Sequence, residues 1–399
     1  MQSDRAHGAL RILANRGRHH APEVTGSTLS TIQASEILSK AADDLMLDAV
    51  ARVDRADVNT ETDSLAVGRL RKLLERDGLA ALSTLARDGT TRALDAHSRF
   101  VLEAIIKLTS RPGLRVINDT IDLADRDIGD MLKPLAAIEP QLPQVLQSVG
   151  RIDLNGHHVG TGFLIAEDLV MTNRHVLEEL ATPAPTILTL TDWELEPGDI
   201  TIDFKREADS PATRVFRITN VEFAGPNPIS SRGYIDFADL DVAILRIEKR
   251  GADGGAQPAP LPLLRGAVGS KPLQDVLVVG YPARPNMRIV DQQGSVRQDV
   301  IDALRRVHSI QFSVKYLSPG VLTALPGAII QDPRKWVFSH DATTLGGNSG
   351  SCVLQYGPQL AVIGIHFAGT FDRANYAHAL QVVEPLLPSH VRDGIRWVE

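Results

Sequence analysis

Three short segments of this sequence hold a histidine, an aspartate and a serine that together could perform nucleophilic catalysis. His175 lies in TNRHV after the apolar run LVM, Asp241 begins the apolar run DVAIL, and Ser349 lies within GGNSGS. A serine hydroxyl is a poor nucleophile at neutral pH and needs a base to take its proton. Histidine suits that role because its ordinary pKa is about 6.5, and a carboxylate can hold the imidazole in the required tautomer. The segments therefore predict a hydroxyl–imidazole–carboxylate site.

The glycines around Ser349 add a second element to this chemistry. They allow the backbone N–H groups of Gly347 and Ser349 to turn toward one point, where they could stabilise an oxyanion. Each segment alone has an ordinary explanation, because Gly-Gly-Asn-Ser-Gly is typical of a turn and an aspartate before a strand is typical of a cap. Their joint occurrence, in this order and at predicted strand ends, favours an active site.

Together the three segments resemble those of trypsin-like (chymotrypsin-fold) serine proteases, including the order His, Asp, Ser along the chain. Within that group they are most similar to the bacterial glutamyl endopeptidases, or staphylococcal V8-like proteases, through residues 344–351 (TLGGNSGS) and 362–369 (VIGIHFAG). The resemblance covers residues 145–390. It implies a serine endopeptidase that hydrolyses peptide bonds through an acyl-enzyme in a cleft between two β-barrels.

The same resemblance indicates which aspartate completes the site and how the protease is activated. Asp236 and Asp239 compete for the role of the acid, and Asp241 is preferred because it directly precedes the apolar strand, as the family pattern requires. In trypsin-type zymogens an aspartate precedes the serine and pairs with a new N-terminal ammonium. Asn348 stands there and is neutral, so activation by an exposed barrel N-terminus is not required.

The resemblance also suggests a substrate preference. The positions that match His366 and Thr344 line the primary pocket of the glutamyl endopeptidases and hold the acidic side chain before the scissile bond. A partly protonated imidazole and a hydroxyl can pair with a carboxylate, so cleavage after Glu or Asp is implied. The alternatives are that His366 only packs within its strand, and that the pocket takes a small or apolar residue.

The N-terminal part of the chain has the periodicity of helices. A capping-box pattern at 30–33 precedes apolar residues at 3–4 spacing as far as Leu45. A second segment (65–74) is expected to stop at Gly78, a third covers 79–85, and a fourth covers 94–108. Short connections between amphipathic helices predict a small antiparallel bundle.

From about residue 145 the sequence instead shows short β-rich runs between turn signals, which indicates an all-β barrel or sandwich. The predicted strands are 161–165, 169–172, 187–190, 241–247, 276–279, 309–314 and 360–365. The expected fold is thus an all-β, chymotrypsin-like double β-barrel preceded by a small α-helical bundle. The expected organisation is an arm (1–26), a helical regulatory or adaptor domain (27–140) and a protease domain (141–399) with barrels at 145–250 and 273–388, a linker at 251–272 and a closing helix at 382–397.

Composition limits the remaining possibilities. The net charge of -7 gives no sign of nucleic-acid binding, no window is apolar enough to predict a membrane span, and residues 1–26 do not resemble a secretory signal. Cys352 is the only cysteine and is expected in the core. The lack of disulfides favours a reducing, cytoplasmic setting, with a bacterial source implied by the resemblance. No cofactor is expected, and the pairs at 19–20 and 157–158 make poor metal sites because neighbouring strand residues point apart.

Three functional hypotheses remain open. The chain is expected to be a protease that acts on a protein or peptide substrate. The first alternative is a catalytically silent protease fold that serves as a binding module. The second is a latent protease held inactive until a partner binds the helical domain. That domain is expected to recruit partners or to self-associate, by analogy with other intracellular proteases.

Overall fold

The computed structural model describes residues 31–54, 61–88, 98, 101, 105, 113–124, 132–184, 192–229, 237–269, 274–283, 312–344, 347–357, 359–370 and 374–399. The chain divides into two compact units. The first carries the N-terminal helices, and the second comprises 113–284, 312–369 and 375–399.

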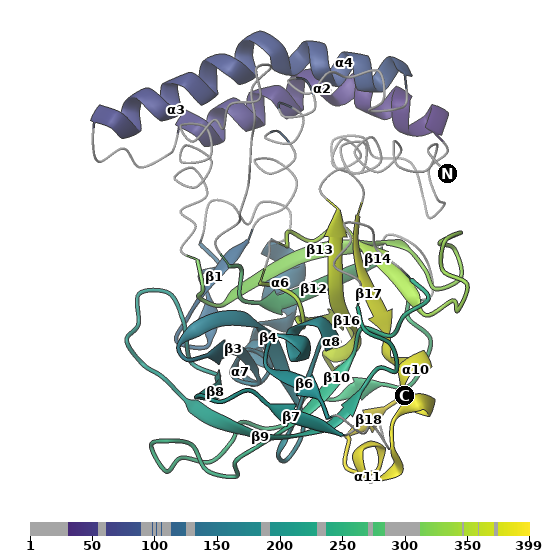
Figure 1. The fold of residues 1–399 in the computed structure, drawn as a ribbon. Coiled ribbons are helices and arrows are strands. Elements are labelled where there is room, and N and C mark those ends of the chain that lie inside the picture. The colour runs from purple at the N-terminus through teal and green to yellow at the C-terminus, as the bar shows by residue number, and fades with distance from the viewer. Residues whose placement is uncertain are drawn as a thin grey trace. The chain divides into compact units, whose positions relative to one another are not determined.

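The first unit contains three helical segments, α2 (Thr31–Asp54), α3 (Glu61–Leu73) and α4 (Leu79–Asp88), and α2 packs alongside the other two (Figure 1). Leu38 and Leu45 on α2 and Leu82 and Leu85 on α4 are buried, as the 3–4 spacing of apolar residues predicts. These segments confirm the first three predicted helices in outline. The predicted arm (1–26) lies outside the described residues, and so does most of the fourth predicted helix.

Gly78 does not end a helix, so that prediction is wrong. The chain continues from α3 through a π-helical turn, Leu74–Gly78, directly into α4. A Cβ atom at Gly78 would lie 2.2 Å from Sδ of Met46 on α2. The glycine therefore permits a close approach of α2 to this turn and does not act as a C-terminal cap.

The second unit contains the first β-barrel, drawn mainly in teal in Figure 1. Its six antiparallel strands close in the order β10-β5-β4-β3-β8-β9, with β9 paired to β10. The strands are β3 (Val149–Leu154), β4 (His157–Ala166), β5 (Leu169–Thr172), β8 (Ile200–Asp203), β9 (Val215–Ala224) and β10 (Ala243–Ile247). A helical turn, α8 (Arg174–Glu178), follows β5, and a small ribbon of β6 (Ala181–Pro183) and β7 (Trp193–Leu195) follows α8.

The second barrel, green to yellow in Figure 1, also has six strands. They run in the order β12-β15-β16-β17-β14-β13, and the β12–β13 pairing closes the ring. The strands are β12 (Asp275–Gly280), β13 (Tyr316–Ala324), β14 (Val337–His340), β15 (Cys352–Gln355), β16 (Ala361–Thr370) and β17 (Ala374–Ala379). One buried apolar cluster contains side chains of both barrels, such as Phe163 and Leu277, so the barrels pack against each other. The predicted double barrel is confirmed.

Three details of the predicted β region need correction. Residues 312–314, the described part of the strand expected at 309–314, form a turn with Ser313 at φ 63°, and the strand begins only at Tyr316. The expected linker contains β11 (Leu263–Leu264), which pairs with β16 and with β18 (Trp397–Val398). The expected closing helix is broken by prolines into α10 (Leu380–Val383), a 3₁₀ turn (Glu384–Leu386) and α11 (Ser389–Arg392).

A hairpin and a short helical stretch precede the first barrel within the same unit. The hairpin consists of β1 (Leu114–Ile117) and β2 (Thr120–Ile121), and the helices are α6 (Leu132–Ile138), a 3₁₀ turn (Glu139–Gln141) and α7 (Leu142–Gln147). β1 pairs with β13 of the second barrel. The second unit therefore begins at Gly113 and not at the expected boundary after residue 140.

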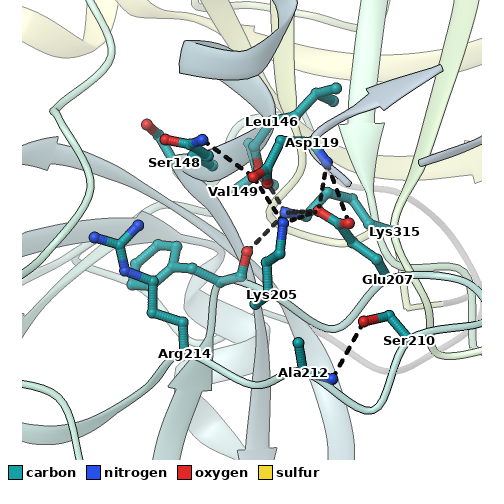
Figure 2. A network of polar contacts seen from close by, with 12 residues as sticks. Asp119, Leu146, Ser148, Val149, Lys205, Glu207, Ser210, Ala212, Arg214 and Lys315 are labelled. Atoms are coloured by element: carbon teal, nitrogen blue, oxygen red, sulfur yellow. Dashed lines mark hydrogen bonds and ion pairs between the residues drawn. The ribbon is translucent and has the colours of Figure 1, made fainter. Parts of the chain in front are cut away.

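A buried polar network ties this hairpin to the barrels (Figure 2). The ammonium of Lys315 is fully buried and donates to the carbonyl oxygens of Leu146 (2.5 Å) and Phe204 (2.7 Å). Its Nζ lies 3.8 Å from a carboxylate oxygen of Glu207, which accepts the backbone N–H of Asp119 in the hairpin turn. Burial of a charge is costly unless the charge is paired and hydrogen-bonded, and each of these contacts lowers that cost.

Candidate active site

His175 lies in the single turn α8, directly after β5. Asn173 is the residue at the turn, with extended backbone angles (φ -82°, ψ 154°), and α8 begins at Arg174. The guanidinium of Arg174 donates to Glu178 (2.9 Å) and to the carbonyl oxygen of Gly225 in the first barrel. These contacts hold the turn against the barrel, and the His175 side chain keeps about a third of its surface exposed (34%).

Asp241 lies directly before β10, and its carboxylate is committed to His175. Asp241 Oδ2 lies 2.6 Å from His175 Nδ1, and Oδ1 accepts the backbone N–H of His175 at 2.9 Å. An ionised carboxylate can only accept, so Nδ1 carries the proton and Nε2 offers a lone pair. The imidazole is thereby fixed in the tautomer that a general base requires.

The backbone of Asp241 is held from two sides. Asn173 Nδ2 donates to the Asp241 carbonyl oxygen at 2.8 Å, and the Asp241 N–H donates to Nε2 of His378 on β17 at 3.1 Å. Asp239, a competitor for the acid, accepts from exposed Asn227 instead. Asp236 lies outside the described residues.

The pKa of His175 is raised above its ordinary value. Burial lowers it, but the charge and hydrogen bond of Asp241, helped by Glu178 and Glu179, outweigh the burial. An imidazolium formed during proton transfer would therefore be stabilised where it forms.

Ser349 lies in the turn that leads into β15, close to His175. Its carbonyl oxygen accepts the N–H of Thr161 on β4 at 2.9 Å. A Cβ atom built on Gly160 would lie 3.3 Å from that oxygen and 2.7 Å from Val176, the residue after His175. Gly160 thus lies between the backbone of the serine turn and α8, and the structure brings the two segments together.

The last contact expected in the site is a hydrogen bond between Ser349 and His175. Among the described residues, no hydrogen bond joins Ser349 Oγ to His175 Nε2. Such bonds are often long before substrate binds, so the gap does not conflict with the roles expected of these residues.

The two expected oxyanion donors lie in this same turn. Gly347 has φ +87° and Gly350 has φ +86°, values that favour glycine. Within the described part of the chain, the N–H groups of Gly347 and Ser349 have no protein acceptor. Unpaired backbone N–H groups are uncommon in folded proteins, and here both are available to a ligand oxygen.

The structure shows the surroundings of His366. The side chain is buried in β16 (3% exposed), and burial, together with the charge of His175, lowers its pKa to about 3. Its Nδ1 has no hydrogen-bond partner among the described residues, and its ring lies edge-on to His340 at 5.4 Å. Without a substrate carboxylate the imidazole is neutral at neutral pH, and the role expected of it in substrate preference stays a prediction.

Thr344 is close to the strand that carries His366. Its hydroxyl donates to Oδ1 of Asn375 at 2.6 Å, and a Cβ atom on Gly369 would lie 2.3 Å from that same oxygen and 3.7 Å from Thr344 Oγ1. Thr344 and Asn375 are therefore hydrogen-bonded to each other and lie against Gly369, which follows His366 by three residues on β16.

Sequence reasoning missed two residues that support the site. Asn173 has a recognisable signal, because it directly follows the strand and precedes the helical turn. His378 has none, since it is one fully buried residue in an ordinary β17 sequence. Its ring stacks on Phe367 at 4.2 Å, and burial lowers its pKa to about 4.

The other candidate groups fit structural roles. Cys352 is fully buried in β15, and burial raises the pKa of its thiol to about 12, as expected for a core residue. His158 lies against Gly160 O (3.2 Å) and Ser313 Oγ (3.3 Å). In the part of the chain that the structure describes, no cluster of three or more His, Cys, Asp or Glu could hold a metal ion, and no helix is long and apolar enough to span a membrane.

Comparison with known proteins places these features in context. Residues 160–365 match the family profile described as the trypsin-like peptidase domain. A protein of Lysobacter enzymogenes named "Probable serine protease" is 34% identical over 296 residues, which cover 71% of this chain and 73% of that protein. Two structures of inactive forms of Rv3671c are similar at 21% and 20% identity, the first a mutant from M. tuberculosis H37Rv. Their TM-scores are 0.35 and 0.34; both cover 63% of this chain, and 90% and 94% of their own chains are matched.

Proposed function

Since the chain belongs to the trypsin-like peptidase family, we propose that it is a serine endopeptidase whose catalytic triad is His175, Asp241 and Ser349. The observation that carries this proposal is the committed carboxylate of Asp241. Both of its oxygens hold His175, so the imidazole presents Nε2 as a base beside the serine turn. This pairing, together with two N–H groups that have no acceptor among the described residues, is the arrangement that such a mechanism requires.

The proposed reaction proceeds in two steps. His175 Nε2 takes the hydroxyl proton as Ser349 Oγ attacks the peptide carbonyl carbon, and the N–H groups of Gly347 and Ser349 stabilise the oxyanion. His175 then gives the proton to the leaving amine, and the C–N bond breaks to leave an acyl-enzyme. Water, deprotonated by His175, attacks the ester carbon, and Ser349 is released with its proton restored.

Cleavage of labelled casein by the full-length chain tests this proposal. Ser349→Ala and His175→Ala should each abolish detectable cleavage, while Ser351→Ala, a substitution two residues away in the same turn, should keep it. A Ser349→Ala chain that cleaves as well as the unmodified chain would refute the assignment. A chain that never cleaves and never reacts at Ser349 would instead support a protease fold used as a binding module.

We further propose a preference for Glu or Asp before the scissile bond, through His366 and Thr344. A neutral imidazole can still donate one N–H to a carboxylate, and a carboxylate that approaches would raise the low pKa of His366. The Thr344 hydroxyl would have to exchange its bond to Asn375 for one to substrate. Profiling a peptide library, with Glu and Gln matched at the position before the cleaved bond, tests this proposal. His366→Ala should erase a preference for Glu over Gln, and an unchanged profile would discard the pocket assignment.

The helical unit is proposed to regulate or target the protease. The proposal rests on the analogy with other intracellular proteases, since singly exposed apolar side chains such as Leu47 (69%) and Leu65 (57%) are ordinary on protein surfaces. Cytoplasmic localisation stays a prediction that rests on the single cysteine.

A further inference from the structure

Thr161 on β4 contacts the serine turn with both its side chain and its backbone. Its side chain is fully buried, and its hydroxyl donates to the carbonyl oxygen of Gly347 at 2.9 Å. Its backbone N–H donates to the carbonyl oxygen of Ser349, also at 2.9 Å. A single residue of the first barrel therefore holds both carbonyl groups that follow the expected oxyanion donors.

The direction of the hydroxyl proton is determined by its neighbours. The backbone N–H of Tyr281, just after β12, donates to Thr161 Oγ1 at 3.1 Å and occupies one lone pair. A hydroxyl has one proton, which is then left for Gly347. The backbone carbonyl of Thr161 is in turn fixed by the hydroxyl of Thr172 at 2.7 Å. The threonine is held on three sides, so it can act as a rigid support for the turn.

Such a support matters because of the backbone of Gly347. A glycine at φ +87° has little conformational preference of its own, and rotation about it would turn its N–H away from the cleft. With the 347–348 and 349–350 peptides both bonded to Thr161, those rotations are restrained. Preorganised donors stabilise a developing oxyanion without reorganising during the reaction.

We propose that the hydroxyl of Thr161 is a positioning group that holds the oxyanion donors of Gly347 and Ser349 in their active arrangement. The proposal rests on the proposed function, since it gives those N–H groups the role of an oxyanion hole. Thr161 does not touch substrate and acts only through the turn.

The test compares Thr161→Val, which removes the hydroxyl and keeps the shape, with Thr161→Ser, which keeps the hydroxyl. Ser148→Ala is the control, because it removes an equally buried hydroxyl that bonds to the carbonyl oxygens of Gln144 (2.8 Å) and Ala259 (2.6 Å) and to neither Thr161 nor the serine turn. Full-length chains are assayed with a fluorogenic peptide chosen from the library profile, and unfolding in urea is followed for each.

Losing one oxyanion donor costs about 10²–10³-fold in rate, and loosening both should cost about 10–100-fold. Thr161→Val should lower kcat by that factor with little change in KM, and should weaken inhibition by a peptide aldehyde, whose adduct places an oxygen in the same site, by a similar factor. Thr161→Ser should restore kcat to within about threefold. Ser148→Ala should lose stability comparably and keep its kcat.

Two results would overturn the proposal. One is a Thr161→Val chain with an unchanged kcat, and the other is an equal fall in kcat for Ser148→Ala. Ser349→Ala, measured alongside, separates this failure from failure of the proposed function. If Ser349→Ala is inactive and Thr161→Val is fully active, only the role of Thr161 is wrong. If Ser349→Ala is active, the triad itself is wrong.

Discussion

At the scale of single residues, the proposed catalytic base is His175, paired with Asp241. The pKa of His175 lies above the ordinary 6.5 because Asp241, helped by Glu178 and Glu179, outweighs the effect of burial. The acid limb of a profile of kcat/KM against pH should therefore lie above pH 6.5. Asp241→Asn removes the charge but not the burial, so the limb should move to lower pH and kcat should fall by about 10⁴-fold, as for such changes in Ser-His-Asp enzymes.

Steady-state kinetics from pH 5 to 9 on the unmodified and Asp241→Asn chains would check this prediction. Asp239→Asn is a suitable control, because Asp239 accepts only from an exposed asparagine. A limb that stays in place after Asp241→Asn would mean that another carboxylate sets the pKa of His175.

The sequence predicted the residues whose chemistry is visible in their types and spacing. Asp241 could be chosen over Asp239 because it abuts an apolar strand, and the structure places it on His175. His378 and the hydroxyl of Thr161 could not be chosen in this way. Their roles arise from contacts between strands far apart in the chain, and their local sequences look like ordinary strand sequences.

At the scale of secondary-structure elements, Asp241 lies in the loop before β10, and the end of β9 packs closely against that loop. A Cβ atom on Gly225 would lie 1.9 Å from the carbonyl oxygen of Leu240, and backbone atoms cannot yield as a flexible side chain can. Gly225→Ala should therefore destabilise the chain by about 1–3 kcal/mol and lower its activity. Gly266→Ala, where a Cβ atom would meet nothing within 4 Å, should change stability by less than about 0.5 kcal/mol. Urea unfolding of both variants checks this prediction, and equal effects would contradict it.

Lys315 should leave a signature in the dependence of stability on pH. Burial lowers its pKa to about 8, against the opposing pull of Glu207, while the ordinary value is 10.5. Between these values the unfolded chain binds more protons than the folded chain, so this group makes stability rise with pH. The neutral amine keeps two N–H donors for the carbonyls of Leu146 and Phe204.

Relative to Lys315→Met, the free energy of unfolding of the unmodified chain should therefore rise from pH 8 to 10.5, by at most about 1.4 kcal/mol per pH unit. Urea unfolding of both chains across this range is the measurement. A difference that stays flat with pH would show that Lys315 does not titrate with a lowered pKa in the folded state.

Short apolar runs between turn signals predicted five of the twelve barrel strands, β4, β5, β10, β12 and β16, because each barrel buries one face of every strand. The hairpin β1–β2 was missed, although its turn has a signal. Asn118 and Asp119 both have positive φ (53° and 60°). In tight hairpin turns, asparagine and aspartate adopt positive φ more readily than other residues that carry a side chain. The helical stop at Gly78 was predicted wrongly because local sequence does not distinguish a capping glycine from one that admits a neighbouring helix.

At the scale of the whole molecule, the unit that carries the barrels begins at Gly113. The hairpin β1–β2 contributes a strand to the second barrel and Asp119 to the buried network, and neither contact can be seen in local sequence. A chain that starts at Gly113 should keep the urea midpoint of the protease unit. A chain that starts at Gln141 should unfold at a lower concentration, because it loses the hairpin. Equal midpoints would mean that the hairpin contributes nothing to the stability of the barrels.

The proposed role of Ser349 as a nucleophile activated by His175 has a direct test. Reaction of the full-length chain with a fluorophosphonate probe, followed by mass spectrometry of its peptides, measures which side chain reacts. We expect one adduct per chain, on Ser349, absent in Ser349→Ala and formed far more slowly in His175→Ala. An adduct on a different serine, or none in a preparation that cleaves peptides, would contradict it.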